Sequence, residues 1–304
     1  MVRFRQLRRE SSAIQLEPIA VASSSYKLTP LRDGTQSVYS VEYEEQMHPG
    51  LGPSAEAEHL HVAQAKIRSR LQNHSGEFVV WDVGLGAAAN ALTLLRLTRD
   101  LSASLHVVSF DNNVGPLSFA LHNADRLEYL SGYQSTVKAM IERHRAELED
   151  GAHNVNWELH LADFPSLIAS SDAASLPKPH AILFDPFSPA KNPAMWTLGV
   201  FENLCKVLDP ARSCVLTTYS RSTVVRVSLL ISGFFVGRGR PTGLKEETTV
   251  AANALDLLGE PLDKSWLETV RKSQSAEPLT SPQYRQSALS PQTWERLQRC
   301  AQFA

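Results

Sequence analysis

The chain has 304 residues, of which 43% are hydrophobic and 20% are charged, and its formal net charge is −2. This composition is typical of a soluble globular enzyme, and the net charge gives no reason to expect a chain-wide nucleic-acid-binding surface. No apolar run reaches the roughly 18 residues that a membrane span needs, so no membrane partner is expected. Three cysteines without metal-ligand spacing argue against a disulfide framework and favour a reducing, cytoplasmic location.

Hydrophobic patterning divides the chain into four segments. They are a disordered N-terminal tail, an N-terminal extension, an α/β core and a C-terminal tail with short helices, at residues 1–27, 28–76, 77–252 and 253–304.

The N-terminal extension is predicted to begin with a hairpin and to end with a helix. Asp33-Gly34 is a hairpin signal between polar residues, and the helix is expected over residues 54–71 with Ser54 as its N-cap. Three histidines lie in this segment: His48, His59 and His61. Because the last two are two positions apart and point to different faces of a helix, no metal site is predicted.

In the core, buried strands alternate with helices. Strands are expected at residues 78–83, 105–110, 155–161, 181–184 and 213–219. Helices are expected at 87–99, 195–208 and 221–231, and a long helical region at 116–149 with an interruption around Ser131-Gly132. Two last strands, at 233–240 and 246–251, are predicted to form an antiparallel edge hairpin, and a short helix is expected at 291–302. This alternation predicts an α/β fold with a Rossmann-like, doubly wound and mostly parallel sheet.

Four of the predicted strands end in or beside an aspartate: Asp82, Asp111, Asp163 and Asp185. Gly84 and Gly86 form a turn after the first strand, where glycine lets the backbone approach a ligand at the start of a helix. Asp111 follows the second strand, where an acid can accept hydrogen bonds from ribose hydroxyls. Together these residues predict a nucleotide-type ligand at the carboxyl edge of the sheet.

Two such ligands compete for this turn. Residues 84–89 fit the dinucleotide fingerprint G-x-G-x-x-A, but Asp82 would then face a pyrophosphate, which is a like-charge pairing. S-adenosylmethionine has no phosphates and carries sulfonium and ammonium groups. Asp163 suits its adenine amino group and Asp185 the region of its methyl donor. A methyltransferase is therefore favoured over a dehydrogenase.

The loop after the fourth strand concentrates chemically active side chains. It reads HAILFDPFSPAKNPAMW over residues 180–196, and its prolines make it stiff. The loop presents a carboxylate, an aromatic ring, a cation, an amide and an indole, at Asp185, Phe187, Lys191, Asn192 and Trp196. Such a rigid polar loop at the carboxyl edge predicts part of an active site.

These motifs resemble a known family. The D-x-G-x-G turn with Asn90 beyond it, the loop D-P-F-S-P-A-K-N-P-x-M-W and the stretch LTTYSRSTVVRVSLLISGF (216–234) are similar to the methyltransferase domain of MnmC and its stand-alone relatives. The resemblance implies a class I methyltransferase that uses S-adenosylmethionine. It further implies N-methylation of the 5-aminomethyl side chain of 2-thiouridine at the tRNA wobble position. tRNA would then be a partner, together with a separate oxidase or upstream wobble-uridine enzymes.

The sequence departs from the family turn E-x-G-F-G-T-G-x-N, because Asp82 replaces the glutamate and Ala87-Ala88-Ala89 the threonine–glycine stretch. Two alternatives stay open. One is a class I methyltransferase, or an enzyme of the aminopropyltransferase type, that acts on another amine. The other is a catalytically inactive relative that binds RNA.

Within the proposed site, Asp185 is expected to orient the substrate amine and to receive its proton, while Phe187, Trp196 and Tyr219 wall the site. RNA phosphates are expected to contact a local set of cations near the carboxyl edge and the last hairpin: Lys191, Arg221, Arg226, Arg238, Arg240 and Lys245.

Overall fold

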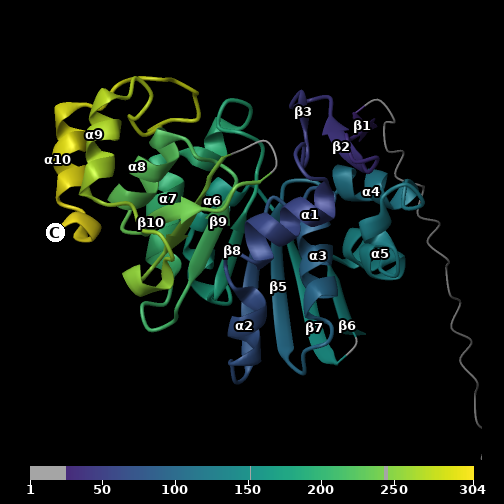
Figure 1. Ribbon diagram of the computed structural model, residues 1–304. Coiled ribbons are helices and arrows are strands. Elements are labelled where there is room, and N and C mark those ends of the chain that lie inside the picture. Colours follow the sequence, from purple (N-terminus) through teal and green to yellow (C-terminus); the bar gives the residue numbers. More distant parts are fainter. Residues whose placement is uncertain (1–24, 151, 243–245) are drawn as a thin grey trace, which may run out of the picture.

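The computed structural model describes residues 25–150, 152–242 and 246–304 and contains a small and a large β-sheet (Figure 1). The small sheet is antiparallel, in the order β1-β2-β3, with β1 at Tyr26–Pro30, β2 at Gln36–Ser40 and β3 at Glu45–Gln46. The expected hairpin is confirmed: β1 pairs with β2, and Gly34 turns between them with φ 88°. The disordered tail expected for residues 1–27 lies mostly outside the described residues.

The large sheet has eight strands in the order β10-β11-β9-β8-β4-β5-β7-β6. Their bounds are β4 Glu77–Val83, β5 Ser104–Asp111, β6 Arg145–Asp150, β7 His153–Leu161, β8 Ala181–Phe184, β9 Val215–Thr218, β10 Phe235–Gly239 and β11 Thr248–Ala252. The five central strands, from β7 to β9, are parallel, and β10–β11 is an antiparallel edge hairpin. The predicted doubly wound sheet is confirmed, with its switch point between β4 and β8.

Helices cover both faces of the sheet, because side chains of each buried strand alternate between two hydrophobic cores. One face carries α1 Pro53–Ala57, η1 Glu58–Val62, α2 Ile67–Gln72, α3 Ala89–Thr98, α4 Gly115–His122, η2 Glu128–Leu130 and α5 Gln134–Arg143. The other carries α6 Phe164–Ala169, η3 Ser171–Ser175, η4 Pro193–Trp196, α7 Leu198–Val207, α8 Thr223–Ile231, α9 Lys264–Lys272, α10 Pro291–Gln298 and η6 Ala301–Phe303. The single turn η5 spans Leu255–Leu257.

The helix expected over residues 54–71 is wrong in detail. Helix α1 begins after Gly52, with Pro53 in its first turn, so Ser54 is not the N-cap. The chain then forms the π-helix η1 and breaks at Lys66, whose φ is 51°, before α2. The π-helical turn has no simple sequence signal, and such turns are frequent at functional sites.

The helix expected up to residue 149 is also wrong, because α5 stops at His144 (φ 56°) and β6 follows. Ala146 and Leu148 face the core between polar neighbours, which is the two-residue period of an edge strand. In the C-terminal segment, α9 was not expected, although Asp263 caps it by accepting hydrogen bonds from the amides of Ser265 and Trp266.

A cluster of histidines and glutamates joins β4, β5 and β7 on the sheet. The ring nitrogens of His106 lie 3.3 Å from Glu77 and 3.2 Å from Glu158, and His160 lies 3.6 Å from Glu158. The hydrogen bond to Glu158 raises the pKa of His106, and the bonds from His106 and His160 lower the pKa of Glu158.

The cluster makes stability depend on pH in a defined window. The raised pKa of His106 stabilises the fold below its unfolded pKa of about 6.5, and the lowered pKa of Glu158 stabilises it above about 4.5, so both contributions are complete only between those values. We expect Glu158→Gln to lower the free energy of unfolding more at about pH 5.5 than at about pH 8.5. Urea titrations at both pH values measure this difference. The exposed Glu147→Gln, beside Arg145, is the control, and equal losses for Glu158→Gln at both pH values would contradict the assignment.

Candidate active site

A cavity of about 320 Å³ lies at the carboxyl ends of β4, β5 and β8, beside the switch point of the sheet. It is lined by the turn after β4, by Asp111 at the end of β5, by Asp185 after β8, and by Tyr43 and His48 of the N-terminal extension. A wider groove of about 1110 Å³ lies around Phe78 and His180 at the amino ends of β4 and β8, but it contains none of the predicted site residues. The smaller cavity is therefore the candidate active site.

The turn after β4 needs glycine at two positions. Gly84 has φ 92°, and a Cβ there would lie 3.0 Å from the backbone oxygen of Asp185. Gly86 has φ 51°, and its Cβ would lie 3.3 Å from Sδ of Met47. Ala88 also has a left-handed backbone, with φ 62°, where the similar family carries glycine. The backbone of Ala88 is therefore strained at the N-cap of α3.

Asp111 and Asp163 line the cavity as predicted. The backbone amide of Gly86 donates to one carboxylate oxygen of Asp111 over 2.9 Å, and those of Asn112 and Asn113 donate to the other. Burial raises the pKa of Asp111, and these amides oppose the rise. The exposed Asp163 caps α6 by accepting a hydrogen bond from the amide of Ser166. Both acids thus have fixed orientations at the edge of the cavity.

Asp82 does not line the cavity, which corrects the expectation that it reaches a cationic group of the ligand. Its side chain is fully buried behind the turn and accepts a hydrogen bond from Oγ of Ser109 over 2.9 Å. Burial, opposed by that bond, raises the pKa of Asp82 to about 7. The alternation of side chains along β4 directs Asp82 into the core rather than to the sheet edge.

Asp185 is the centre of the site. Its Oδ2 accepts a hydrogen bond from Nδ2 of Asn90 over 2.8 Å, so two predicted residues meet. Nε2 of His61 and Nδ1 of His48 each lie 3.8 Å from the same oxygen. Burial alone would raise the pKa of Asp185, but His61, His48 and Asn90 outweigh it and hold the pKa below its usual value.

Sequence reasoning missed the two histidines as neighbours of Asp185, because it considered them only as metal ligands. Within the described part of the chain, no group of three or more His, Cys, Asp or Glu side chains is arranged to hold a metal ion. The stretch around His48, SVYSVEYEEQMHPGLGPSAEA at residues 37–57, also resembles the segment that precedes the core in the similar family, and this was the signal available.

The predicted aromatic residues differ in their positions. Phe187 lines the cavity and stacks on Tyr43, with ring centroids 4.3 Å apart. Asn192 and Tyr219 also line it, and the hydroxyl of Tyr219 donates to the backbone oxygen of Pro186 over 2.9 Å. Trp196 does not: it is 1% exposed, and its indole donates to the backbone oxygen of Phe187 over 2.8 Å. Trp196 is a core residue that fixes the loop, which corrects its assignment as a substrate contact.

The N-terminal extension is attached to the loop after β8 by contacts that were not expected. The carboxylate of Glu45 accepts hydrogen bonds from the amide and hydroxyl of Ser188, the latter over 2.8 Å. Nζ of Lys191 lies 2.7 Å from the carboxylate of Glu44, outside the cavity. The extension therefore forms one wall of the site.

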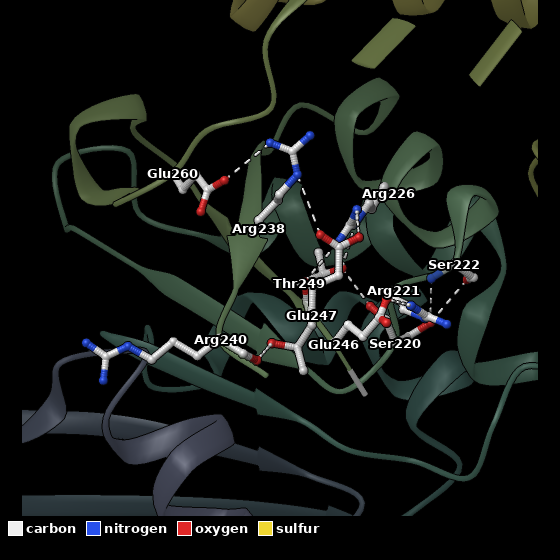
Figure 2. Close-up of polar contacts among 11 residues, drawn as sticks. Ser220, Arg221, Ser222, Arg226, Arg238, Arg240, Glu246, Glu247, Thr249 and Glu260 are labelled. Carbon is white, nitrogen blue, oxygen red and sulfur yellow. Dashed lines mark hydrogen bonds and ion pairs between the residues drawn. The ribbon is translucent and has the colours of Figure 1, made fainter. Parts of the chain in front are cut away.

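Figure 2 shows where the predicted RNA-binding arginines lie. Arg226 is 3% exposed and donates to Thr249, Glu247 and the backbone oxygen of Thr248, so its assignment to RNA is wrong. Arg221 pairs with Glu246 over 3.5 Å.

Two further cations of that set lie on β10 or just after it. Arg238 pairs with Glu247 and Glu260, and the guanidinium of Arg240 points away from these acids (Figure 2). Lys245 lies outside the described residues.

The charge of the cavity indicates what it can hold. Five carboxylates line it, from Glu45, Glu56, Asp111, Asp163 and Asp185, and none of its described lining residues is lysine or arginine. Such a lining disfavours the pyrophosphate of a dinucleotide and suits a ligand with cationic groups. The glycine turn and Asp111 therefore fit S-adenosylmethionine.

Residues 128–254 match a family described as S-adenosyl-L-methionine-dependent methyltransferases. This match, together with the fold and the glycine turn, supports an S-adenosylmethionine-dependent methyltransferase, with S-adenosylmethionine as its cofactor. No helix of the described chain combines the length and apolarity required to traverse a bilayer.

The predicted resemblance to the methyltransferase domain of MnmC is also confirmed. The tRNA 5-methylaminomethyl-2-thiouridine biosynthesis bifunctional protein MnmC of Leptospira interrogans is 28% identical over 224 residues, which are 69% of this chain and 33% of that protein. Its counterpart in Burkholderia vietnamiensis is 31% identical over 217 residues, which are 66% and 31% of the two chains. This chain thus spans about a third of the length of these relatives.

A solved structure supports the fold. MNMC2 from Aquifex aeolicus aligns with a TM-score of 0.64 at 23% identity, covering 91% of this chain and 84% of that one.

Because Ala88 has a strained backbone, glycine substitutions at two buried alanines near the start of α3 should change stability by different amounts. These are Ala88 and Ala91, which are both 0% exposed. Ala91→Gly should lower the free energy of unfolding by about 2 kcal/mol, from lost helix propensity and a lost buried methyl group. Ala88→Gly should change it by less than about 1 kcal/mol, because relief of the left-handed backbone offsets the lost methyl. Urea denaturation measures both, and equal losses would show that the φ of Ala88 carries no strain.

A structural role for Arg226 predicts a large loss of stability on truncation. Arg226→Ala leaves two buried oxygens, of Thr248 and Thr249, without this donor and leaves Glu247 paired only with Arg238 among the described residues, so we expect the free energy of unfolding to fall by about 3 kcal/mol. Arg221→Ala is the matched control, and its exposed pair with Glu246 should contribute less than about 1 kcal/mol. Denaturation curves compare the two variants. A small loss for Arg226→Ala would return this residue to the candidates for RNA binding.

Proposed function

We propose that this protein methylates the amino group of the 5-aminomethyl side chain of uridine or 2-thiouridine at the tRNA wobble position. The observation that carries the proposal is the open carboxylate oxygen of Asp185 in a cavity whose described lining lacks lysine and arginine. Asn90 and two imidazoles face Oδ2, while Oδ1 accepts no hydrogen bond from the described residues. That oxygen can orient a substrate amine. The names of the relatives, which refer to tRNA 5-methylaminomethyl-2-thiouridine biosynthesis, supply the RNA class.

In this proposal, the cofactor and the substrate amine bind in different parts of the cavity. Asp111 is placed to bind ribose hydroxyls and Asp163 to bind the adenine amino group, while the turn at Gly84 and Gly86 lets the backbone approach the cofactor. When bound, S-adenosylmethionine supplies an electrophilic methyl group. Asp185 then holds the amine beside it, and the stacked rings of Tyr43 and Phe187 form an apolar wall that limits water.

In this proposal, the main contribution of Asp185 and its neighbours to catalysis is to orient the substrate amine. An alkylamine has a pKa of about 10, so roughly one molecule in a thousand is neutral at pH 7. Positioning can supply about 7 kcal/mol or more of the barrier reduction when the reacting atoms are aligned. A carboxylate with a lowered pKa is a weak base, so Asp185 orients the amine more effectively than it deprotonates it.

For tRNA binding, the proposal relies on cations outside the cavity, near Arg221 and Arg240 and at Lys191. Lys191 and Arg221 are paired with Glu44 and Glu246, so an RNA phosphate must compete with these carboxylates for the two cations. A separate oxidase, or another upstream wobble-uridine enzyme, would supply the aminomethyl substrate in the cytoplasm.

A second candidate is a transferase for a small amine of the aminopropyltransferase type. The structure brings Glu45 and Glu56 into the cavity, so it is more acidic than the loop alone indicated. However, Glu45 holds Ser188, and Glu56 accepts a hydrogen bond from the amide of Gly50. Both carboxylates are thus engaged in shaping the wall of the site, which favours the first candidate.

The proposal predicts a selective loss of methyl transfer on substitution of Asp185. With labelled S-adenosylmethionine and tRNA that carries 5-aminomethyl-2-thiouridine, the wild type should label the wobble uridine. Asp185→Asn should lower kcat by about a hundredfold or more, because it removes the charge that orients the amine. Asp172→Asn, an exposed position outside the cavity, should leave it unchanged.

Two outcomes would contradict this function. Transfer to a free diamine but not to tRNA would support the second candidate. Absence of transfer to either, with S-adenosylmethionine bound, would show that the acceptor is a different molecule.

A further inference from the structure

We propose that His48 accepts, on Nε2, the proton that the substrate amine must lose, and that Asp185 holds the imidazole in the tautomer that leaves Nε2 free. This inference rests on the proposed function, since it names the base for the same reaction. It assigns to the N-terminal extension a catalytic group as well as a wall of the cavity.

The orientation of His48 supports this role. Nδ1 faces Oδ2 of Asp185 across 3.8 Å, whereas Nε2 has no hydrogen-bond partner among the described residues. A carboxylate beside Nδ1 favours the tautomer with its proton on Nδ1, so the lone pair of Nε2 is the acceptor. His48 lines the cavity, and its side chain is 12% exposed, which gives an accepted proton a route to solvent.

The backbone directs His48 into this position. It has a left-handed conformation with φ 52° and is followed by Pro49. A residue other than glycine is strained in this region, and such strain concentrates at functional sites. The preceding Met47 is held by its amide, which donates to the backbone oxygen of Val38 on β2 over 2.8 Å.

His61 is the alternative base, and the structure argues against it. It is 0% exposed and does not line the cavity, so a substrate proton cannot reach it directly. Its Nδ1 lies 2.7 Å from Oγ1 of Thr217, and its Nε2 faces Oδ2 of Asp185. His61 is therefore a positioning residue that acts through Asp185.

The proposed step balances. The substrate enters as R–NH₃⁺, and His48 takes one proton to become an imidazolium paired with Asp185. The nitrogen lone pair then forms the bond to the methyl carbon, and the electrons of the carbon–sulfur bond remain on sulfur, giving S-adenosylhomocysteine. The product leaves as R–NH₂⁺–CH₃, and His48 returns its proton to solvent.

Several ionisable groups surround His48 and bear on any pH profile. Asp185 faces it directly, and His61 faces the same carboxylate oxygen. The other ionisable side chains that line the cavity are Tyr26, Tyr43, Glu45, Glu56, Asp111, Asp163 and Tyr219.

The first measurement needs neither cofactor nor RNA. In the full chain labelled with ¹⁵N-histidine, ring-nitrogen shifts at high pH should show His48 with its proton on Nδ1, and Asp185→Asn should reduce that preference. His48→Gln identifies the signal, and the exposed His59→Gln on η1 should leave it unchanged. A proton on Nε2 of His48 in the wild type would overturn the proposal.

The second measurement is the pH profile of kcat on tRNA that carries 5-aminomethyl-2-thiouridine, at saturating S-adenosylmethionine. His48→Gln should lower kcat by about a hundredfold and abolish the acidic limb of the profile, which is the contribution expected of a general base. S-adenosylhomocysteine binding by calorimetry should stay within about threefold of wild type, so a folding defect is separable. His61→Leu should lower kcat while keeping the acidic limb, and His61→Gln, which restores a donor toward Asp185, should recover part of the rate.

The outcomes separate the two proposals. If His48→Gln keeps kcat within about threefold and retains the acidic limb, His48 is not the base. If the wild type methylates no aminomethyl-uridine tRNA but His48 carries its proton on Nδ1, the RNA substrate is wrong and the His48–Asp185 pair stands.

Discussion

The site depends on the close approach of two strand ends. At the switch point, β4 and β8 lie side by side, and the turn after β4 passes so near the backbone of Asp185 that a Cβ at Gly84 would lie 3.0 Å from its oxygen. This contact brings the start of α3, with Asn90, against the carboxylate of Asp185. The glycine turn and the loop after β8 are therefore packed against each other, and a larger residue at position 84 would push the two segments apart.

The N-terminal extension completes this unit from far away in the sequence. Glu45 binds Ser188, 143 positions further along the chain, and Tyr43 stacks on Phe187. The same segment places His48 and His61 against Asp185. Closing such a distant contact costs chain entropy, which the buried aromatic and charge-assisted contacts must offset. The cavity thus exists only when the extension is folded onto the core, and the extension is part of the catalytic domain.

Residues close together in the sequence were the most predictable. The buried runs of β4, β5, β8 and β9 are short and uniformly apolar, and the order of strands and helices followed from them. The acids after the strands were identified because parallel strands bring their carboxyl ends to one edge. The π-helical turn, the edge strand β6 and the buried state of Arg226 were not identified. The edge strand β6 forms a hairpin with β7, which follows it directly in the chain, so only its two-residue period could have identified it. The burial of Arg226 depends on Glu247 and Thr249, which lie 21 and 23 positions further along the chain.

The aspartates at the ends of β4 and β8 look equivalent in the sequence, yet their surroundings separate them. Burial raises the pKa of Asp82 to about 7, with the charge of Asp185 adding to the rise, and only Ser109 donates to its carboxylate among the described residues. Asp185 receives Asn90 and faces two imidazoles, which hold its pKa below the usual value. Two nearby carboxylates cannot both ionise cheaply in a buried site. The two pKa values are therefore shifted in opposite directions, because Asp82 is buried with one donor among the described residues whereas Asp185 is buried beside an amide and two imidazoles.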